Sequence, residues 1–167
     1  WMLFVVSTQS IVVLGMLIVS RFAPWEEMFT YAMLGFYLLG CMFYILIMSL
    51  ILYRFMFFKI VAEDMTPPYW INMGAMAITT LAGANILLKG DSAFLADMVP
   101  FIKGFTVFFW AAGTWWIPYL FILGAWRHFY KHYPLTYHPV YWGLVFPMGM
   151  YTVATYRLAE VLSMDFL

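Results

Sequence analysis

The sequence has few charged residues and only one cysteine, and both shortages exclude whole classes of protein. Only 10% of the 167 residues are charged, against roughly 25% in an ordinary soluble domain. Lys and Arg balance Asp and Glu at eight each, so no net charge favours nucleic acid as a partner. Cys41 alone excludes an internal disulfide framework. The sequence is instead 66% hydrophobic and 22% aromatic, which suits lipid as the solvent.

Motifs of catalysis and of metal binding are also missing. The sequence has no phosphate-binding glycine loop, no nucleophile elbow and no paired-carboxylate motif. His128 and His132 are four residues apart, and His138 follows, but no Cys or carboxylate in that loop completes a ligand set. We expect Arg127 and Lys131 to extend to the membrane interface beside these histidines. The sequence predicts no enzyme, no metal site and no cofactor.

Five apolar stretches are each long enough to cross about 30 Å of hydrocarbon as a helix. They span about residues 3–20, 31–58, 69–88, 99–126 and 140–162, and short loops with Pro or Gly separate them. Strands of a barrel would alternate apolar and polar residues, whereas these stretches are apolar on every face. We therefore predict an all-α membrane protein with a single transmembrane domain over residues 1–167. Because the chain begins at Trp1, we expect it to be a fragment of a longer chain.

Basic residues collect in two of the connecting loops. Arg54 and Lys59 follow the second predicted helix, and Arg127 and Lys131 follow the fourth. Loops that are rich in Lys and Arg remain in the cytoplasm. This pattern predicts that these two loops lie on one side of the membrane, the cytoplasmic side.

The first, third and fifth predicted helices carry small and polar residues, whereas the second and fourth are dominated by bulky ones. This alternation indicates an inner row of odd helices that could line a path. The pore-lining candidates are Gln9, Ser10, Asn72, Gly74, Thr79 and Thr152. The alternative for each small residue is close helix packing. Gln9 needs a polar partner inside its span, and either a water-filled path or a helix–helix hydrogen bond would serve.

The fifth predicted helix contains Phe146, Pro147 and Gly149 within four residues. A proline removes a backbone hydrogen bond and bends a helix, and the ring of Phe146 beside such a bend could narrow a pore. The alternative is a bend that serves packing only. Further along, Arg157 and Glu160 are three residues apart, a spacing that favours a local ion pair.

Two long motifs lie in the third and fifth predicted helices. Residues 67–79 read PPYWINMGAMAIT, and residues 141–155 read YWGLVFPMGMYTVAT. Both resemble the tellurite-resistance/dicarboxylate transporter family, which includes bacterial tellurite-resistance proteins, fungal malate and sulfite transporters and plant slow anion channels. Residues 7–10, which read STQS, also resemble the fifth helix of that family. The resemblance covers nearly the whole chain.

The resemblance implies a fold of ten helices in five hairpins, with inner helices around a pore, usually assembled as a homotrimer. The five helices here would match the fifth to the ninth, with the odd ones inside, so this chain alone should not conduct. In channel members a phenylalanine of the ninth helix plugs the pore, and Phe146 matches it. The family also implies an integral protein of the plasma (inner) membrane.

These expectations lead to one functional prediction and two alternatives. The prediction is channel-like transport of small anions, such as a C4-dicarboxylate, sulfite or an inorganic anion. A proton-coupled secondary transporter of dicarboxylates is the first alternative, for which Glu160 is the single weak candidate for the proton-binding carboxylate. A structural membrane subunit without transport activity is the second.

Overall fold

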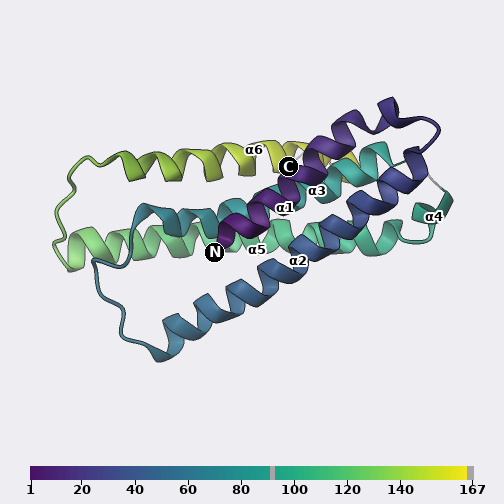
Figure 1. The fold of residues 1–167 in the computed structure, drawn as a ribbon. Coiled ribbons are helices and arrows are strands. Elements are labelled where there is room, and N and C mark those ends of the chain that lie inside the picture. The colour runs from purple at the N-terminus through teal and green to yellow at the C-terminus, as the bar shows by residue number, and fades with distance from the viewer. Residues whose placement is uncertain (91–92, 165–167) are drawn as a thin grey trace.

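The chain forms an up-and-down bundle of five long helices (Figure 1). The structure is a computed structural model, and it describes residues 1–90 and 93–164. The long helices are α1 (Met2–Ile18), α2 (Glu26–Phe57), α3 (Ile71–Lys89), α5 (Val99–Ala125) and α6 (Trp142–Leu162). Short helical segments are η1 (Val19–Phe22), η2 (Pro67–Trp70), α4 (Ala93–Ala96), the π-helical turn η3 (Trp126–Tyr130) and η4 (Pro139–Tyr141). The described residues include no strand, so the all-α fold is confirmed.

The ends of the helices lie close to those predicted, with two differences. Helix α2 begins at Glu26, whereas the sequence predicted a start near Tyr31. Glu26 and Glu27 occupy its first turn, where the positive end of the helix dipole favours carboxylates. The fourth predicted helix does not end at Trp126, because the π-helical turn η3 extends it to Tyr130.

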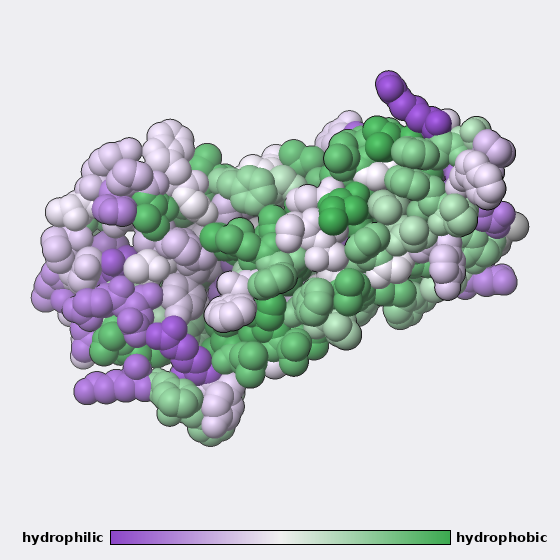
Figure 2. Space-filling view, in the orientation of Figure 1, coloured by the Kyte–Doolittle hydropathy of each residue, from purple (hydrophilic) through white to green (hydrophobic). Residues whose placement is uncertain are grey.

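The protein is an integral membrane protein. Among the described residues, four helical segments are long and apolar enough to span a bilayer: α1 with η1, α2, η2 with α3, and α5 with η3. Figure 2 shows a hydrophobic belt between two more hydrophilic ends. Helix α6 packs along α3, but Arg157 and Glu160 lower its hydropathy, and it is not among the four. Its crossing as a fifth span therefore stays a prediction.

The loops with the basic residues lie together at one end of the bundle (Figure 1). Arg127, after α5, connects to the loop before α3, since its Nη1 donates a hydrogen bond to the carbonyl oxygen of Met65 at 2.6 Å. At the same end, Arg54 forms an ion pair with Asp64 at 2.7 Å. The predicted pairing of the two loops is confirmed, whereas the side of the membrane that this end faces stays a prediction.

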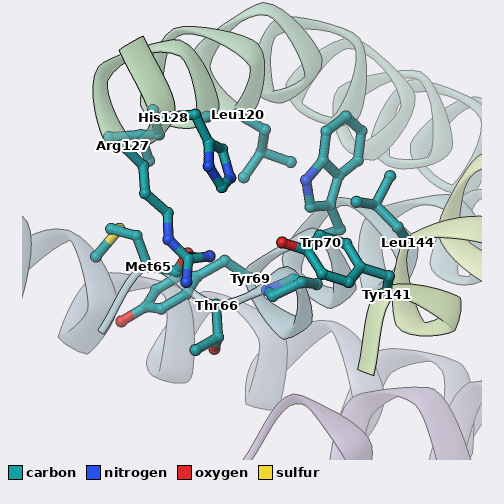
Figure 3. A pocket seen from close by; sticks show the side chains of 12 residues that line it. Met65, Thr66, Tyr69, Trp70, Leu120, Arg127, His128, Tyr141 and Leu144 are labelled. Atoms are coloured by element: carbon teal, nitrogen blue, oxygen red, sulfur yellow. Dashed lines mark hydrogen bonds between the residues drawn. The ribbon is translucent and has the colours of Figure 1, made fainter. Parts of the chain in front are cut away.

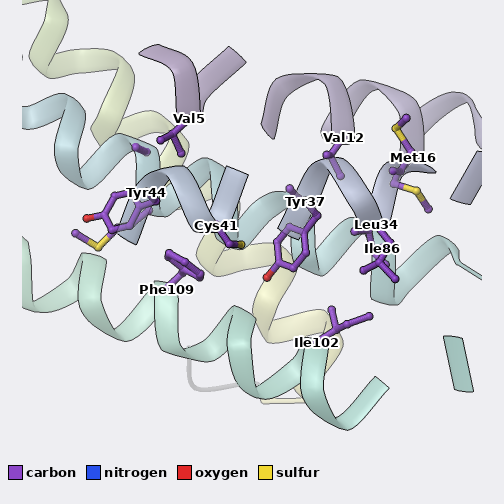
Figure 4. Close-up of a cluster of buried hydrophobic side chains, with 14 of the residues drawn as sticks. Val5, Val12, Met16, Leu34, Tyr37, Cys41, Tyr44, Ile86, Ile102 and Phe109 are labelled. Carbon is purple, nitrogen blue, oxygen red and sulfur yellow. The ribbon is translucent and has the colours of Figure 1, made fainter. Parts of the chain in front are cut away.

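Helix α3 forms the centre of the bundle. All its residues from Asn72 to Ile86 are buried, and it packs against α1, α2, α5 and α6. Its small residues let these neighbours approach closely. Larger side chains fill the space between the other helices, among them Val12, Tyr37 and Phe109 (Figure 4). Helix α3 contacts α1 and α6 directly, so neither α2 nor α5 separates it from the other two odd helices of the prediction.

Polar side chains connect the helices inside this apolar core. Gln9 of α1 donates from Nε2 to the carbonyl oxygen of Tyr37 on α2 at 3.1 Å. The Tyr37 hydroxyl meets the hydroxyl of Thr106 on α5 at 3.3 Å. The Thr106 hydroxyl itself donates to the carbonyl oxygen of Ile102, so Tyr37 acts as the donor to Thr106. Gly83 of α3 leaves room for this pair, because a Cβ there would lie 2.9 Å from the Tyr37 hydroxyl.

We expect the Tyr37→Phe substitution to lower the stability of the protein by about 0.6 kcal/mol, a typical value for a hydrogen bond between membrane helices. The substitution removes the bond to Thr106 and keeps the ring in place. Thermal unfolding in detergent measures the effect. Tyr53→Phe is the control, because Tyr53 lies on the same helix with its side chain exposed. An equal loss in both variants would contradict a role for the Thr106 bond.

Candidate functional site

A close approach between α3 and α6 joins two residues of the resemblance motifs, Gly74 and Pro147. Pro147 is buried, and a Cβ added to Gly74 would lie 3.1 Å from Pro147 Cβ and Cγ. A contact this short allows only glycine without a shift of one helix. The proline interrupts the hydrogen-bond ladder of α6, yet the helix continues through it to Leu162. Gly74 therefore sets the position of α6 at the point where the helix can bend.

Phe146 lies directly beside this contact, but its ring does not share the burial of Pro147. Its side chain is 50% exposed, like many other large apolar side chains on the surface of this membrane bundle. Gly149 and Thr152 are also exposed on α6. The part of α6 next to its proline thus presents an apolar ring, a glycine and a hydroxyl on its uncovered surface.

Two hydrogen bonds fix the second half of α6 to α5. Trp110 donates from Nε1 to the hydroxyl of Thr155 at 2.9 Å, and the hydroxyls of Thr114 and Tyr151 are 2.7 Å apart. The sequence prediction did not include these partners, since α5 had been taken as an outer helix of bulky residues. Helix α6 is consequently held to α3 by close packing and to α5 by polar contacts.

The pore-lining candidates of α1 point in different directions. Ser10 is exposed, and its hydroxyl donates to the carbonyl oxygen of Val6. Gln9 is fully buried against α2, where its amide packs onto Gly40. Of the two roles considered for Gln9, the helix–helix hydrogen bond is the one that this structure contains.

The candidates of α3 are buried, unlike Thr152 of α6. Thr79 is fully buried and donates to the carbonyl oxygen of Ala75. Asn72 is buried with its Nδ2 unpartnered among the described residues. Gly74 faces Pro147. These residues and Thr152 do not share one exposed face, so their pore-lining role stays a prediction.

The charged pair of α6 is local, as its spacing predicted. Arg157 Nη1 donates to Glu160 Oε2 at 2.8 Å, and both side chains are partly exposed. By contrast, the expectation for Arg127 was wrong. Its side chain does not extend to solvent but is 7% exposed, because it turns back to bond the loop before α3. No pattern in the sequence distinguishes this buried arginine from the exposed Lys131 four residues later.

Comparison with known proteins agrees with this arrangement of apolar helices. The sequence profile of the voltage-dependent anion channel family matches residues 1–167, which is the whole chain. The chain belongs to the voltage-dependent anion channel family. The family is one of channels and transporters, and the resemblance of the motifs around Gly74 and Pro147 is thereby confirmed.

Individual relatives of this anion-channel family member are membrane proteins or transporters by name. An uncharacterized membrane protein of Mycobacterium tuberculosis is 42% identical over 115 residues, which cover 69% of this chain and 58% of the relative. An uncharacterized transporter of Methanocaldococcus jannaschii is 26% identical over 126 residues, which cover 75% of this chain and 35% of the relative. No solved structure matches the chain significantly. The chain thus aligns with little more than half of the mycobacterial relative and about a third of the archaeal one.

Proposed function

We propose that this chain contributes α1, α3 and α6 to the inner layer of a channel-like pore for small anions, with the exposed face of α6 beside the path and α3 buried behind it. Helices α2 and α5 form the outer, lipid-facing layer. The remaining inner helices come from the rest of the full-length protein, which assembles as a homotrimer in the plasma (inner) membrane. A C4-dicarboxylate, sulfite or an inorganic anion is the transported species. No step of catalysis and no cofactor is involved.

The contact between Pro147 and Gly74 is the observation that carries this proposal. It fixes α6 on the central helix and leaves the ring of the preceding Phe146 half-exposed. An apolar ring in a narrow path blocks ions by steric closure and by excluding water. Phe146 is then the gate, Pro147 and Gly149 allow α6 to bend, and Thr152 lines the path beyond the ring.

The charges of the bundle favour a channel over a proton-coupled carrier. A coupled carrier needs an ionisable group that takes up and releases protons along the path. Among the described residues of the five long helices, Glu160 of α6 was the candidate, and its carboxylate is engaged by Arg157 in an exposed pair. Selectivity for anions would come from the positive ends of helix dipoles and from hydroxyl groups.

Anion flux into proteoliposomes that contain the full-length protein tests the proposal. We expect current with chloride, nitrate, sulfite or malate that does not require a pH gradient, because Glu160, the candidate for a proton-binding carboxylate, is paired with Arg157. Empty liposomes are the control for leakage. Flux that strictly requires a proton gradient would favour the coupled carrier, and no flux with any of these anions would favour a structural subunit.

A further inference from the structure

A small cavity lies at the basic end of the bundle, where three helices meet. Its volume is about 70 Å³. The segment with η2 at the start of α3 forms one wall, the last turns of α5 with η3 form the second, and the start of α6 forms the third (Figure 3). A water molecule needs about 10–15 Å³ of such space. The cavity can therefore hold several waters or one small polyatomic ion.

The buried guanidinium of Arg127 lines this cavity without a carboxylate partner. Its Nη1 donates to the Met65 carbonyl oxygen, and its Cζ lies 4.2 Å from the ring centroid of Tyr133. Its Nε has no hydrogen-bond partner among the described residues. The C-terminal end of α5 favours a cation here, but partial charges do not replace a counter-ion. Arg127 is only 7% exposed, and a buried charge is costly unless it is paired.

The indole of Trp70 and the hydroxyl of Tyr141 can each offer a hydrogen-bond donor at this cavity. His128 Nδ1 lies 2.9 Å from the carbonyl oxygen of Tyr133 and donates to it, because a carbonyl only accepts, so this N–H is already used outside the cavity. Figure 3 places the His128 imidazole, the Trp70 indole and the Tyr141 hydroxyl around the same space as Arg127. No Asp or Glu is among the described residues that line it. The nearby carboxylate of Asp64 is already engaged by Arg54.

We propose that this cavity is a binding site for a phosphate-type oxyanion, separate from the gate at Phe146. An arginine fork together with hydroxyl and ring N–H donors suits an ion that presents several oxygen atoms in different directions. The bound ion would join α3, α5 and α6 through Arg127, Trp70 and Tyr141. Free inorganic phosphate and the phosphate of a lipid headgroup share this chemistry, and the cavity lies at the end of the bundle that carries the basic loops.

Thermal unfolding of the purified full-length protein in detergent tests the site. Inorganic phosphate or phosphatidic acid is added in increasing concentration while the ionic strength is held constant. A ligand that binds only the folded state raises Tm as its concentration increases. We expect Arg127→Gln to weaken the apparent Kd by about tenfold or more, since it removes the only buried cation of the described cavity wall. Lys131→Gln is the matched control, because it removes the same charge from an exposed position at the same end.

Tyr141→Phe provides a second test that leaves the bond between Arg127 and Met65 intact. It should also weaken the phosphate response, whereas Tyr130→Phe, at an exposed tyrosine of η3, should not. A Tm response to phosphate that these pocket variants reduce supports a free anion as the ligand, and a response to phosphatidic acid alone supports a headgroup. If wild type responds to neither, or if Arg127→Gln and Tyr141→Phe respond as wild type does, the proposal is wrong. Anion flux through the pore could survive either result, so the two proposals fail separately.

Discussion

The Phe146→Ala substitution should raise the basal anion conductance of the full-length protein by about tenfold, which corresponds to a barrier lower by about 1.4 kcal/mol. The ring is large, apolar and half-exposed, and it stands beside the proline that is fixed on α3. Its removal opens space and reduces the exclusion of water from the path. Currents in proteoliposomes, normalised to the amount of folded protein, measure the change.

Phe108→Ala is the matched control for this experiment. Phe108 is 54% exposed, nearly the same fraction as Phe146, but it lies on α5. If α5 faces lipid, truncating the Phe108 side chain should leave the conductance unchanged. A wild-type conductance for Phe146→Ala, with folded protein present, would exclude Phe146 as the gate. If Phe146→Ala instead lowers the free energy of unfolding by roughly 3–5 kcal/mol, as the truncation of a buried Phe does, the ring is a packing residue.

The Gly74→Val substitution should destabilise the bundle by about 1–3 kcal/mol, the usual cost of overpacking. A Cβ added to Gly74 would lie 3.1 Å from Cβ and Cγ of Pro147 and 3.2 Å from its backbone Cα. The backbone atom cannot rotate away, so one of the two helices must shift. Thermal unfolding in detergent should detect the loss as a lower Tm.

Gly104→Val is the control for this second substitution. Gly104 lies in the first two turns of a long helix, as Gly74 does, but nothing lies within 4 Å of a Cβ added there. Both variants carry the same cost of a β-branched residue in a helix, so their difference isolates the contact with Pro147. Equal Tm values would mean that α6 does not depend on this contact. A shifted α6 should also displace the ring of Phe146, so Gly74→Val is expected to change the conductance as well.

The closeness of Gly74 to Pro147 could not be predicted from either motif alone. Both residues were singled out, one as a pore-lining candidate and the other as a bend. Their contact depends on the depth and rotation at which α3 and α6 pack, and small residues on every face of α3 leave that rotation undetermined. Arg127 shows the same limit, because hydropathy along the chain cannot distinguish a buried arginine at the end of a helix from an exposed lysine in the next turn.

The sequence by itself determined the apolar composition, the five long helices and the position of most of their ends, because lipid requires each helix to satisfy its own backbone groups over about 20 residues. It also determined the local pair of Arg157 and Glu160, which depends only on helical spacing. Only the tertiary structure decided that α3 is the central helix, that Gln9 bonds α2, and that Arg127 is buried beside a cavity. Those facts depend on how helices rotate and approach one another, and in an almost uniformly apolar chain the packing of side chains decides that.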